Sequence, residues 1–190
     1  MYVILCLGKI TMQFETERLT IRRMTMDDLD AVYSHRKNPN TSKYIGAPAT
    51  LELAKERVIQ ACQPWKGGVD ERLILAIVKK SQAQLIGELV FKYVDAGKRV
   101  GEIGFRLAEA EIGKGYGEEA ATALIKEAFQ SLSLDTIQAI CAVENLQSQR
   151  LMLKLGMKRK TRLKAFLDIG SEKHDIYIYQ LNNLSCYIRK

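Results

Sequence analysis

The amino-acid sequence predicts one α/β domain with a mixed sheet, and three observations support this. Runs of apolar and β-branched residues at 73–80, 84–94 and 99–107 are separated by short turns, which is typical of an antiparallel meander. A glycine-rich stretch at 113–117 then leads into an amphipathic segment and a buried-looking strand, as in a strand–helix–strand crossover. The chain has 190 residues, 47% of them hydrophobic, which suffices for one domain with a substantial core.

The first third of the chain predicts one strand and two helices. Residues 18–24 (RLTIRRM) alternate apolar and polar side chains, as a half-buried strand does. Thr25 and Asp28 have the spacing of a capping box, which predicts that a helix begins there. A second helix is expected from Thr50 to just before Pro64.

The last third predicts two helices and three strands. Apolar residues recur at helical spacing over 120–132, and the apolar run at 136–143 predicts a buried strand. A further helix is expected at 146–155, with Gly156 in place as its C-terminal cap. The final strands are expected near 157–167 and 174–181.

The net charge and the positions of the cysteines and histidines indicate which ligands and partners the chain is expected to bind. The formal net charge of +7 and the isoelectric point near 9.2 favour an anionic partner: nucleic acid, an acidic membrane surface or a polyphosphate cofactor. The four cysteines are far apart with no CxxC pair, and neither of the two histidines is near a cysteine. We therefore expect free thiols in a reducing compartment and no metal site.

The termini are expected to lie outside the domain. The apolar run at 2–7 is too short to span a membrane and lacks the leading positive charge of a signal peptide, so a cytoplasmic protein without a membrane segment is expected. The domain itself is predicted at 14–182. Residues 1–13 are either an appended strand or a segment preceding the true start, and 183–190 form a tail.

Residues 111–120 (EIGKGYGEEA) place three glycines where a helix should begin, although each glycine in a helix costs about 1 kcal/mol relative to alanine. A simple loop is one explanation. A dinucleotide-binding turn needs a different glycine spacing directly after a strand, and a Walker A loop needs a following Gly-Lys-Ser/Thr. A pyrophosphate cradle fits better, because bare backbone N–H groups at a helix N-terminus can approach a phosphate closely. Lys114 would add positive charge.

Four segments in order resemble the GNAT superfamily of N-acetyltransferases. IGKGYGEEA and the downstream ENLQSQRLMLKLGMK (144–158) look like its acetyl-CoA signature. The likeness covers residues 14–181. Two further segments, the leading ETERLTIRRMTMDDLDAVY and the strand GEIGFRL, resemble in particular the branch of ribosomal-protein alanine N-acetyltransferases. The resemblance implies a mixed, mostly antiparallel twisted sheet with helices on both faces and splayed central parallel strands. It also implies acetyl transfer from acetyl-CoA to a primary amine.

The resemblance also implies where acetyl-CoA binds. The pantetheine arm would lie between the strands at 99–107 and 136–143, and residues 113–118 would hold the pyrophosphate. One position, Ile112, departs from the Gln or Arg that is frequent in the superfamily. The expected cofactor-binding residues are Phe105, Arg106, Leu107, Ile112, Gly113, Lys114, Gly115, Tyr116, Gly117, Glu118, Asn145 and Ser148.

A general base would help the reaction, because a lysine-type amine with a pKa near about 10.4 is almost fully protonated at pH 7. Glu102 and Glu88 are the candidates, acting through water. Strand alternation places Glu102 on the same face as Arg106, so the alternative for Glu102 is a carboxylate paired with that arginine.

The leaving thiolate needs a proton donor. Many members of the superfamily have a tyrosine where this chain has Met152, which cannot donate a proton. The branch it resembles uses a serine three residues after an asparagine, which implies Ser148 after Asn145. The alternative is that both residues only cap the helix.

The acceptor amine is the least determined part. A protein N-terminal α-amine is favoured by the resemblance, whereas polyamines, amino-sugar antibiotics and a non-catalytic acetyl-CoA- or nucleic-acid-binding domain stay open. The loop at 38–46 would shape the acceptor site. Five basic residues in KRKTRLK (158–164) form either a solvated strand face or a landing patch for the CoA 3′-phosphate, the ribosome or RNA. A monomer or a homodimer is expected.

Overall fold

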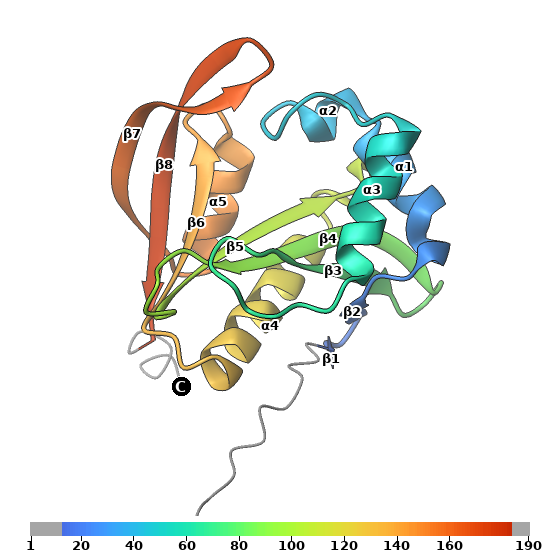
Figure 1. Cartoon of the computed structure of the whole chain (residues 1–190), viewed down its shortest axis with the longest axis horizontal. Coiled ribbons are helices and arrows are strands. Elements are labelled where there is room, and N and C mark those ends of the chain that lie inside the picture. The colour runs from blue at the N-terminus through green and yellow to red at the C-terminus, as the bar shows by residue number, and fades with distance from the viewer. Residues whose placement is uncertain (1–12, 184–190) are drawn as a thin grey trace, which may run out of the picture.

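The computed structural model describes residues 13–183, so the predictions for 1–12 and 184–190 lie outside the described residues. Within this part, an eight-stranded sheet has the order β1-β2-β3-β4-β5-β6-β8-β7 (Figure 1). The elements in chain order are β1 (Phe14–Glu15), β2 (Leu19–Arg23), η1 (Met26–Asp28), α1 (Leu29–Arg36), α2 (Pro39–Ser42), α3 (Leu51–Cys62), β3 (Leu73–Lys79), β4 (Gln84–Tyr93), β5 (Val100–Leu107), η2 (Glu109–Glu111), α4 (Tyr116–Ser131), β6 (Thr136–Ala142), α5 (Leu146–Lys154), β7 (Lys158–Ile169) and β8 (Glu172–Asn182).

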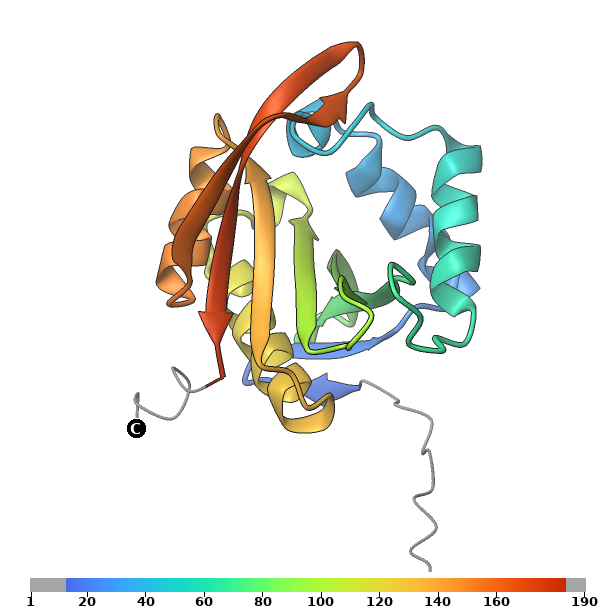
Figure 2. The same cartoon turned by 60° about the vertical axis from the view of Figure 1, so that its left-hand side comes forward.

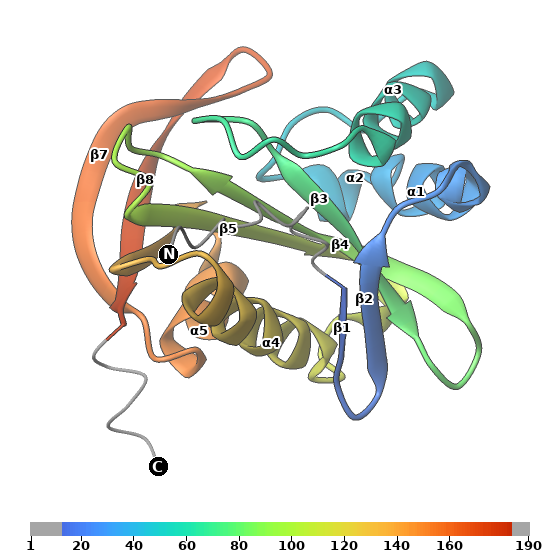
Figure 3. The ribbon, with the colours of Figure 1, turned by 60° about the horizontal axis from the view of Figure 1, so that its bottom comes forward.

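The helices cover both faces of the sheet. Figure 3 shows α1, α2 and α3 on one side and α4 and α5 on the other. The larger apolar core lies between the sheet and α4, where Leu124 and Ile137 are fully buried. A smaller core lies under α1 and α3, where Val58 packs with Ile74. The predicted mixed α/β class is confirmed.

The predicted meander of β3, β4 and β5 is confirmed, with Leu75 opposite Leu89 and Glu88 opposite Arg106. Antiparallel partners point to the same face of a sheet, so Glu88 and Arg106 share a face. The backbones of β4 and β5 approach closely at Gly87. A Cβ there would overlap the carbonyl oxygen of Arg106 and lie 2.8 Å from Leu107 Cδ2. Gly87 is therefore required by packing.

The parallel strands β5 and β6 pair only at their beginnings. The ladder joins Val100–Glu102 to Thr136–Gln138 and ends there, while β6 stays paired with β8 through Ala142. The second half of β5 thus has an edge that no strand covers. The splayed central parallel strands implied by the resemblance are confirmed.

The helix-terminal signals work as predicted. Both hydrogen bonds of the Thr25–Asp28 capping box are present. The Thr50 side chain accepts a hydrogen bond from Leu53 N–H at the start of α3. Gly156 has φ +78°, the left-handed conformation that glycine adopts readily after a helix. Three short elements were not expected: the strand β1, the 3-10 helix η2 and the helix α2 within the predicted loop at 38–46.

The β7–β8 hairpin is longer than predicted and turns at Gly170 (φ +62°). Its tip extends past β6 toward α2 (Figures 1 and 2). The basic side chains of 158–164 are exposed on the edge strand β7, and Arg162 pairs with Asp175 at 2.7 Å. This agrees with a solvated strand face, and the charges also discourage pairing of this edge with another chain. In the part that the structure describes, none of the helices has the length and apolar character needed to cross a membrane.

We predict that Gly87→Ala destabilises the fold, because the added methyl group has to displace backbone atoms of β5. Overpacking of this kind costs about 1–3 kcal/mol. Gly104→Ala is the matched control, since a Cβ added there would have Val90 Cβ as its nearest neighbour, at 3.8 Å. Urea unfolding of both variants should show a clear loss only for Gly87→Ala. Equal stability of the two would contradict the close approach.

Candidate active site

A cavity of about 620 Å³ opens where β5 and β6 diverge. It is bordered by the end of β5, the glycine loop before α4, the start of α5 and the region around α2. The structure brings most of the predicted cofactor residues together here. Those that line it are Phe105, Arg106, Leu107, Ile112, Gly113, Gly115, Gly117, Glu118, Asn145 and Ser148.

The glycine loop presents backbone donors to this cavity. Gly113 and Gly115 both have φ +83°, a conformation that side-chain-bearing residues adopt only with strain. The first N–H groups of a helix have no partner within the helix. In the described part of the chain, the N–H groups of 113–118 meet no other backbone or side-chain acceptor. They form a ready-made anion site at the positive end of α4.

Lys114 and Tyr116 do not line the cavity. The Lys114 ammonium lies 3.2 Å from the Glu111 carboxylate, and its carbonyl accepts a hydrogen bond from Arg18 Nη1 at 3.1 Å. The Tyr116 ring stacks under the Arg18 guanidinium, 4.5 Å from the ring centre. The side chains of both residues therefore anchor the loop from behind, and only their backbones belong to the donor array.

The uncovered edge of β5 forms a second binding element. Beyond Glu102 this strand is paired only with β4, so its opposite edge offers backbone groups over Phe105–Leu107. An extended ligand with amide groups can pair with such an edge as an added strand does. The pantetheine arm of CoA carries two amides and fits this edge.

The start of α5 gives Asn145 and Ser148 different roles. Asn145 is the N-cap, and its Oδ1 accepts a hydrogen bond from Ser148 N–H at 3.0 Å. The Ser148 hydroxyl lines the cavity and forms no hydrogen bond within residues 13–183. Met152, one turn later, is 1% exposed and belongs to the core. Capping thus explains Asn145 but not the hydroxyl of Ser148.

Glu102 lies outside the cavity lining, three residues before Phe105 on β5. Its carboxylate accepts a hydrogen bond from Gln138 Nε2 at 2.9 Å and lies 3.6 Å from Lys92 Nζ. The alternative prediction of an ion pair with Arg106 is wrong, because Lys92 and Gln138 occupy the carboxylate.

Glu88 is 1% exposed and saturated with donors. Its carboxylate accepts from Arg36 Nη1 at 2.6 Å and Arg57 Nε at 3.0 Å, and His35 Nε2 lies 3.3 Å away. Burial alone would raise the pKa of this carboxyl, but the contacts with His35, Arg57 and Arg36 hold the pKa well below its usual range. A carboxylate held this firmly is a poor proton acceptor, so the structure does not support Glu88 as a general base.

Sequence reasoning missed the partners of Glu88 and several cavity residues, namely Glu144, Leu146, Gln147, Arg150, Leu151 and Lys154. Arg36 and Arg57 come from α1 and α3, and no spacing in the sequence relates these helices to β4. Glu144, at the end of β6, lines the cavity with its carboxylate 3.6 Å from His174 Nδ1. Its position directly before the capping Asn145 was the available signal.

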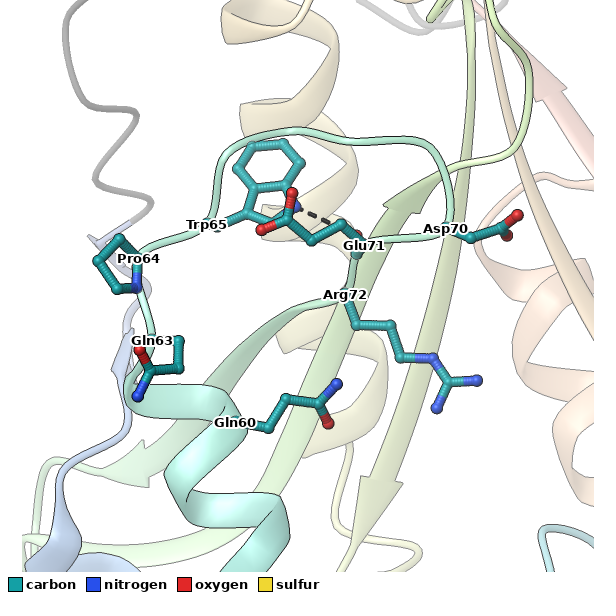
Figure 4. Close-up of a pocket in the computed structure, with 7 residues that line it drawn as sticks. All are labelled: Gln60, Gln63, Pro64, Trp65, Asp70, Glu71 and Arg72. Atoms are coloured by element: carbon teal, nitrogen blue, oxygen red, sulfur yellow. Dashed lines mark hydrogen bonds between the residues drawn. The ribbon is translucent and has the colours of Figure 1, made fainter.

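A second hollow of about 350 Å³ lies beside the C-terminal end of α3 (Figure 4). The Trp65 ring stacks on Tyr93, and its N–H donates to the Glu71 carbonyl at 3.1 Å. These contacts fix the loop at 63–72. None of the predicted site residues lies there.

Comparison with known proteins agrees with this geometry. The family described as acetyltransferase (GNAT) domain matches residues 18–158. The uncharacterized N-acetyltransferase YnaD of Bacillus subtilis is 32% identical over 170 residues, covering 90% of this chain and 96% of YnaD. A GNAT-family acetyltransferase from Bacillus anthracis superposes with a TM-score of 0.80 at 30% identity, covering 90% of this chain and 98% of that one.

A third similarity concerns the fold alone. The ribosomal-protein-S5-alanine acetyltransferase of Vibrio fischeri has a TM-score of 0.77 at 21% identity, with 90% of this chain and 96% of that chain covered.

A splayed parallel pair and a glycine loop lined with backbone donors, brought together in one cavity, are the features expected of an acetyl-CoA-dependent acyltransferase site. The chain belongs to the GNAT family and is an acetyl-CoA-dependent N-acetyltransferase.

We predict that Gly115→Val weakens acetyl-CoA binding at least about tenfold, which corresponds to about 1.4 kcal/mol. The branched side chain would disfavour φ +83°, and its Cβ would lie 3.3 Å from Arg18 Nη2, so the loop that carries the donors would have to shift. Gly170→Val is the matched control, because Gly170 also has a positive φ (+62°) with no atom within 4 Å of an added Cβ, and it lies at the distant β7–β8 turn. Calorimetry measures both. Parent-like affinity of Gly115→Val would show that the pyrophosphate binds elsewhere.

Proposed function

We propose that this N-acetyltransferase acetylates the α-amine of a protein or peptide N-terminus. The observation that carries this is that neither of the two predicted bases is well placed. Glu88 is locked by its three partners, and Glu102 lies outside the cavity lining. Such a site suits an amine that is partly neutral already. An α-amine with a pKa near about 8 meets this condition, and a lysine-type amine near about 10.4 does not.

The surroundings of the cavity support a peptide acceptor. Residues around α2 form one wall of the cavity, namely Asn40, Thr41, Tyr44 and Ile45. A structural neighbour of the same fold is a ribosomal-protein-S5-alanine acetyltransferase. If the acceptor is presented on a ribosome, the exposed basic strand β7 offers a surface for RNA contact.

The residues of the site have the following roles in this proposal. The N–H groups of 113–118 hold the pyrophosphate of acetyl-CoA, and the β5 edge pairs with the pantetheine arm. The acceptor nitrogen attacks the thioester carbon, and the C–S bond breaks as the C–N bond forms. The Ser148 hydroxyl donates a hydrogen bond and then a proton to the departing sulfur, and the proton lost by the amine passes through water. Glu102, whose carboxylate is occupied by Gln138 and Lys92, takes no direct part in this transfer.

Ser148→Ala is expected to lower kcat about 10²-fold, the low end for general acid–base catalysis, with little change in acetyl-CoA affinity. The loss is moderate because a free thiol has a pKa of about 8.5 and can leave partly unassisted. Asn145→Ala is the matched control. It removes the cap of α5 and should lower the free energy of unfolding by about 1 kcal/mol. An unchanged kcat together with a lower thermal midpoint for Ser148→Ala would show that this serine has a structural role only.

The acceptor class is tested by thiol release from acetyl-CoA with N-terminal peptides, spermidine-type polyamines and amino sugars. We expect turnover with peptides bearing a free N-terminus and none with the same peptides after N-terminal blocking. The rate should rise with pH, reach half of its maximum near about pH 8 and level off about one unit higher, as the α-amine loses its proton. Turnover only with polyamines or amino sugars would overturn the peptide proposal while leaving acetyl transfer intact.

A further inference from the structure

An unbalanced cluster of buried and partly buried charges lies between the sheet and the helices α1 and α3. It consists of three arginines (Arg36, Arg57 and Arg106), one carboxylate (Glu88) and the buried His35. Arg36 and Arg57 are paired with Glu88 at 2.6 and 3.0 Å. Three guanidinium charges against one carboxylate leave two positive charges without a balancing anion in the cluster.

Arg106 is the residue that leaves the cluster unbalanced. It is 8% exposed, and its Nη1 donates one hydrogen bond, to Ser42 Oγ at 3.3 Å. Within residues 13–183 its guanidinium forms no ion pair, because the nearby Glu88 accepts from His35, Arg36 and Arg57 instead. Burial and the neighbouring Arg36 lower the pKa of Arg106 to about 10. A buried guanidinium without an anion costs stability, so a ligand that supplies one would be bound strongly.

A second hydrogen-bond donor in this cluster also has no partner. The Nε of Arg36 is buried and has no hydrogen-bond partner in the described part of the chain. Ser42 links the two arginines, because its hydroxyl donates to the Arg36 carbonyl at 3.1 Å and accepts from Arg106 Nη1 at 3.3 Å. Of the two, Arg106 lines the cavity, and a guanidinium can bind a carboxylate or a phosphate through paired N–H···O bonds.

The position of Arg106 assigns this anion to the acceptor rather than to CoA. The glycine loop that holds the pyrophosphate begins α4, and α4 packs on the opposite face of the sheet (Figure 3). Arg106 lines the cavity, and its partner Ser42 ends α2, whose residues Asn40 and Thr41 also line it. The guanidinium thus lies at the wall where the acceptor is expected.

We propose that the acceptor amine carries an anionic group, a carboxylate or a phosphate, a short distance from the nitrogen, and that Arg106 binds it. This rests on the proposed acetylation of amines by this cavity. The anion comes from either of two sources: an acidic side chain after the N-terminal residue of a peptide, or the carboxylate or phosphate of a small amino compound.

The test compares matched acceptors with the full-length protein. Two peptides differ only at the second residue, glutamate against glutamine, and two small amines differ only in bearing a carboxylate or its amide. We expect the acidic member of at least one pair to have a kcat/KM about tenfold higher or more, as charge-assisted hydrogen bonds provide. Which pair shows the preference identifies the source of the anion.

Arg106→Gln should reduce this preference to near unity while acetyl-CoA affinity stays close to that of the parent. Arg159→Gln is the matched control, because Arg159 is exposed on β7 and stacks on Tyr177, 4.6 Å from the ring centre. If Arg106→Gln fails to fold, the comparison of acidic and amide acceptors with the parent protein still tests the proposal. Inorganic phosphate should inhibit competitively with the acceptor and not with acetyl-CoA.

The two proposals fail in different ways. Equal rates for acidic and amide acceptors, or phosphate inhibition competitive only with acetyl-CoA, would overturn the anion site while peptide acetylation stands. A preference seen only among small amines would support the anion site and overturn the peptide acceptor. If no acceptor in the set supports thiol release, calorimetric binding of the acidic and amide peptides to the CoA complex decides, and equal affinities overturn the anion site.

Discussion

The short parallel pairing between β5 and β6 is the constraint on which the rest of the site depends. Three residue pairs hold the strands together, and beyond Glu102 and Gln138 the two strands follow different partners. β6 remains paired with β8, and β5 remains paired with β4. The backbone N–H and C=O groups on the unpaired edge of β5 can form hydrogen bonds with a ligand that carries amide groups. The binding cavity is therefore an interruption of the sheet, and the two cores on either face hold that interruption open.

The glycine loop also leaves backbone groups unpaired, in this case at the start of a helix. α4 begins with N–H groups that no residue of the described chain satisfies, and the left-handed conformations at Gly113 and Gly115 turn the loop around them. Arg18 holds this loop from β1–β2, through the Lys114 carbonyl and the Glu119 carboxylate. If the pyrophosphate binds here as proposed, the binding strength would come from backbone groups that folding leaves without partners and would depend little on the side chains of the loop. Ile112, where the superfamily often has Gln or Arg, would then be compatible with the site.

Local signals in the sequence predicted most of the fold and part of the site. Capping at Thr25 and Thr50, the left-handed Gly156 and the glycines of 113–117 each act over a few residues, so the chain shows them directly. The contacts of Glu88 could not be predicted in this way. They join α1, α3 and β4 over separations of 31 to 53 residues, and charged side chains buried together leave no apolar periodicity. The same limit applies to Glu102, whose partner on β6 depends on the register of a parallel pair.

Consecutive residues of β5 point to opposite faces of the sheet, and in our proposals they serve different substrates. Phe105 and Leu107 pack with the core on the α4 side, whereas Arg106 faces Ser42 and Glu88 on the side of α1 and α3. A shift of β5 by a single residue would exchange these faces and invert the chemistry of the cavity at once. Insertions and deletions should therefore be poorly tolerated in the turn at 94–99, which sets the register of β5 against β4, and well tolerated at the β7–β8 turn around Gly170. Among related sequences of this fold, we expect length differences to be common at the tip of the β7–β8 hairpin and rare at the turn that leads into β5.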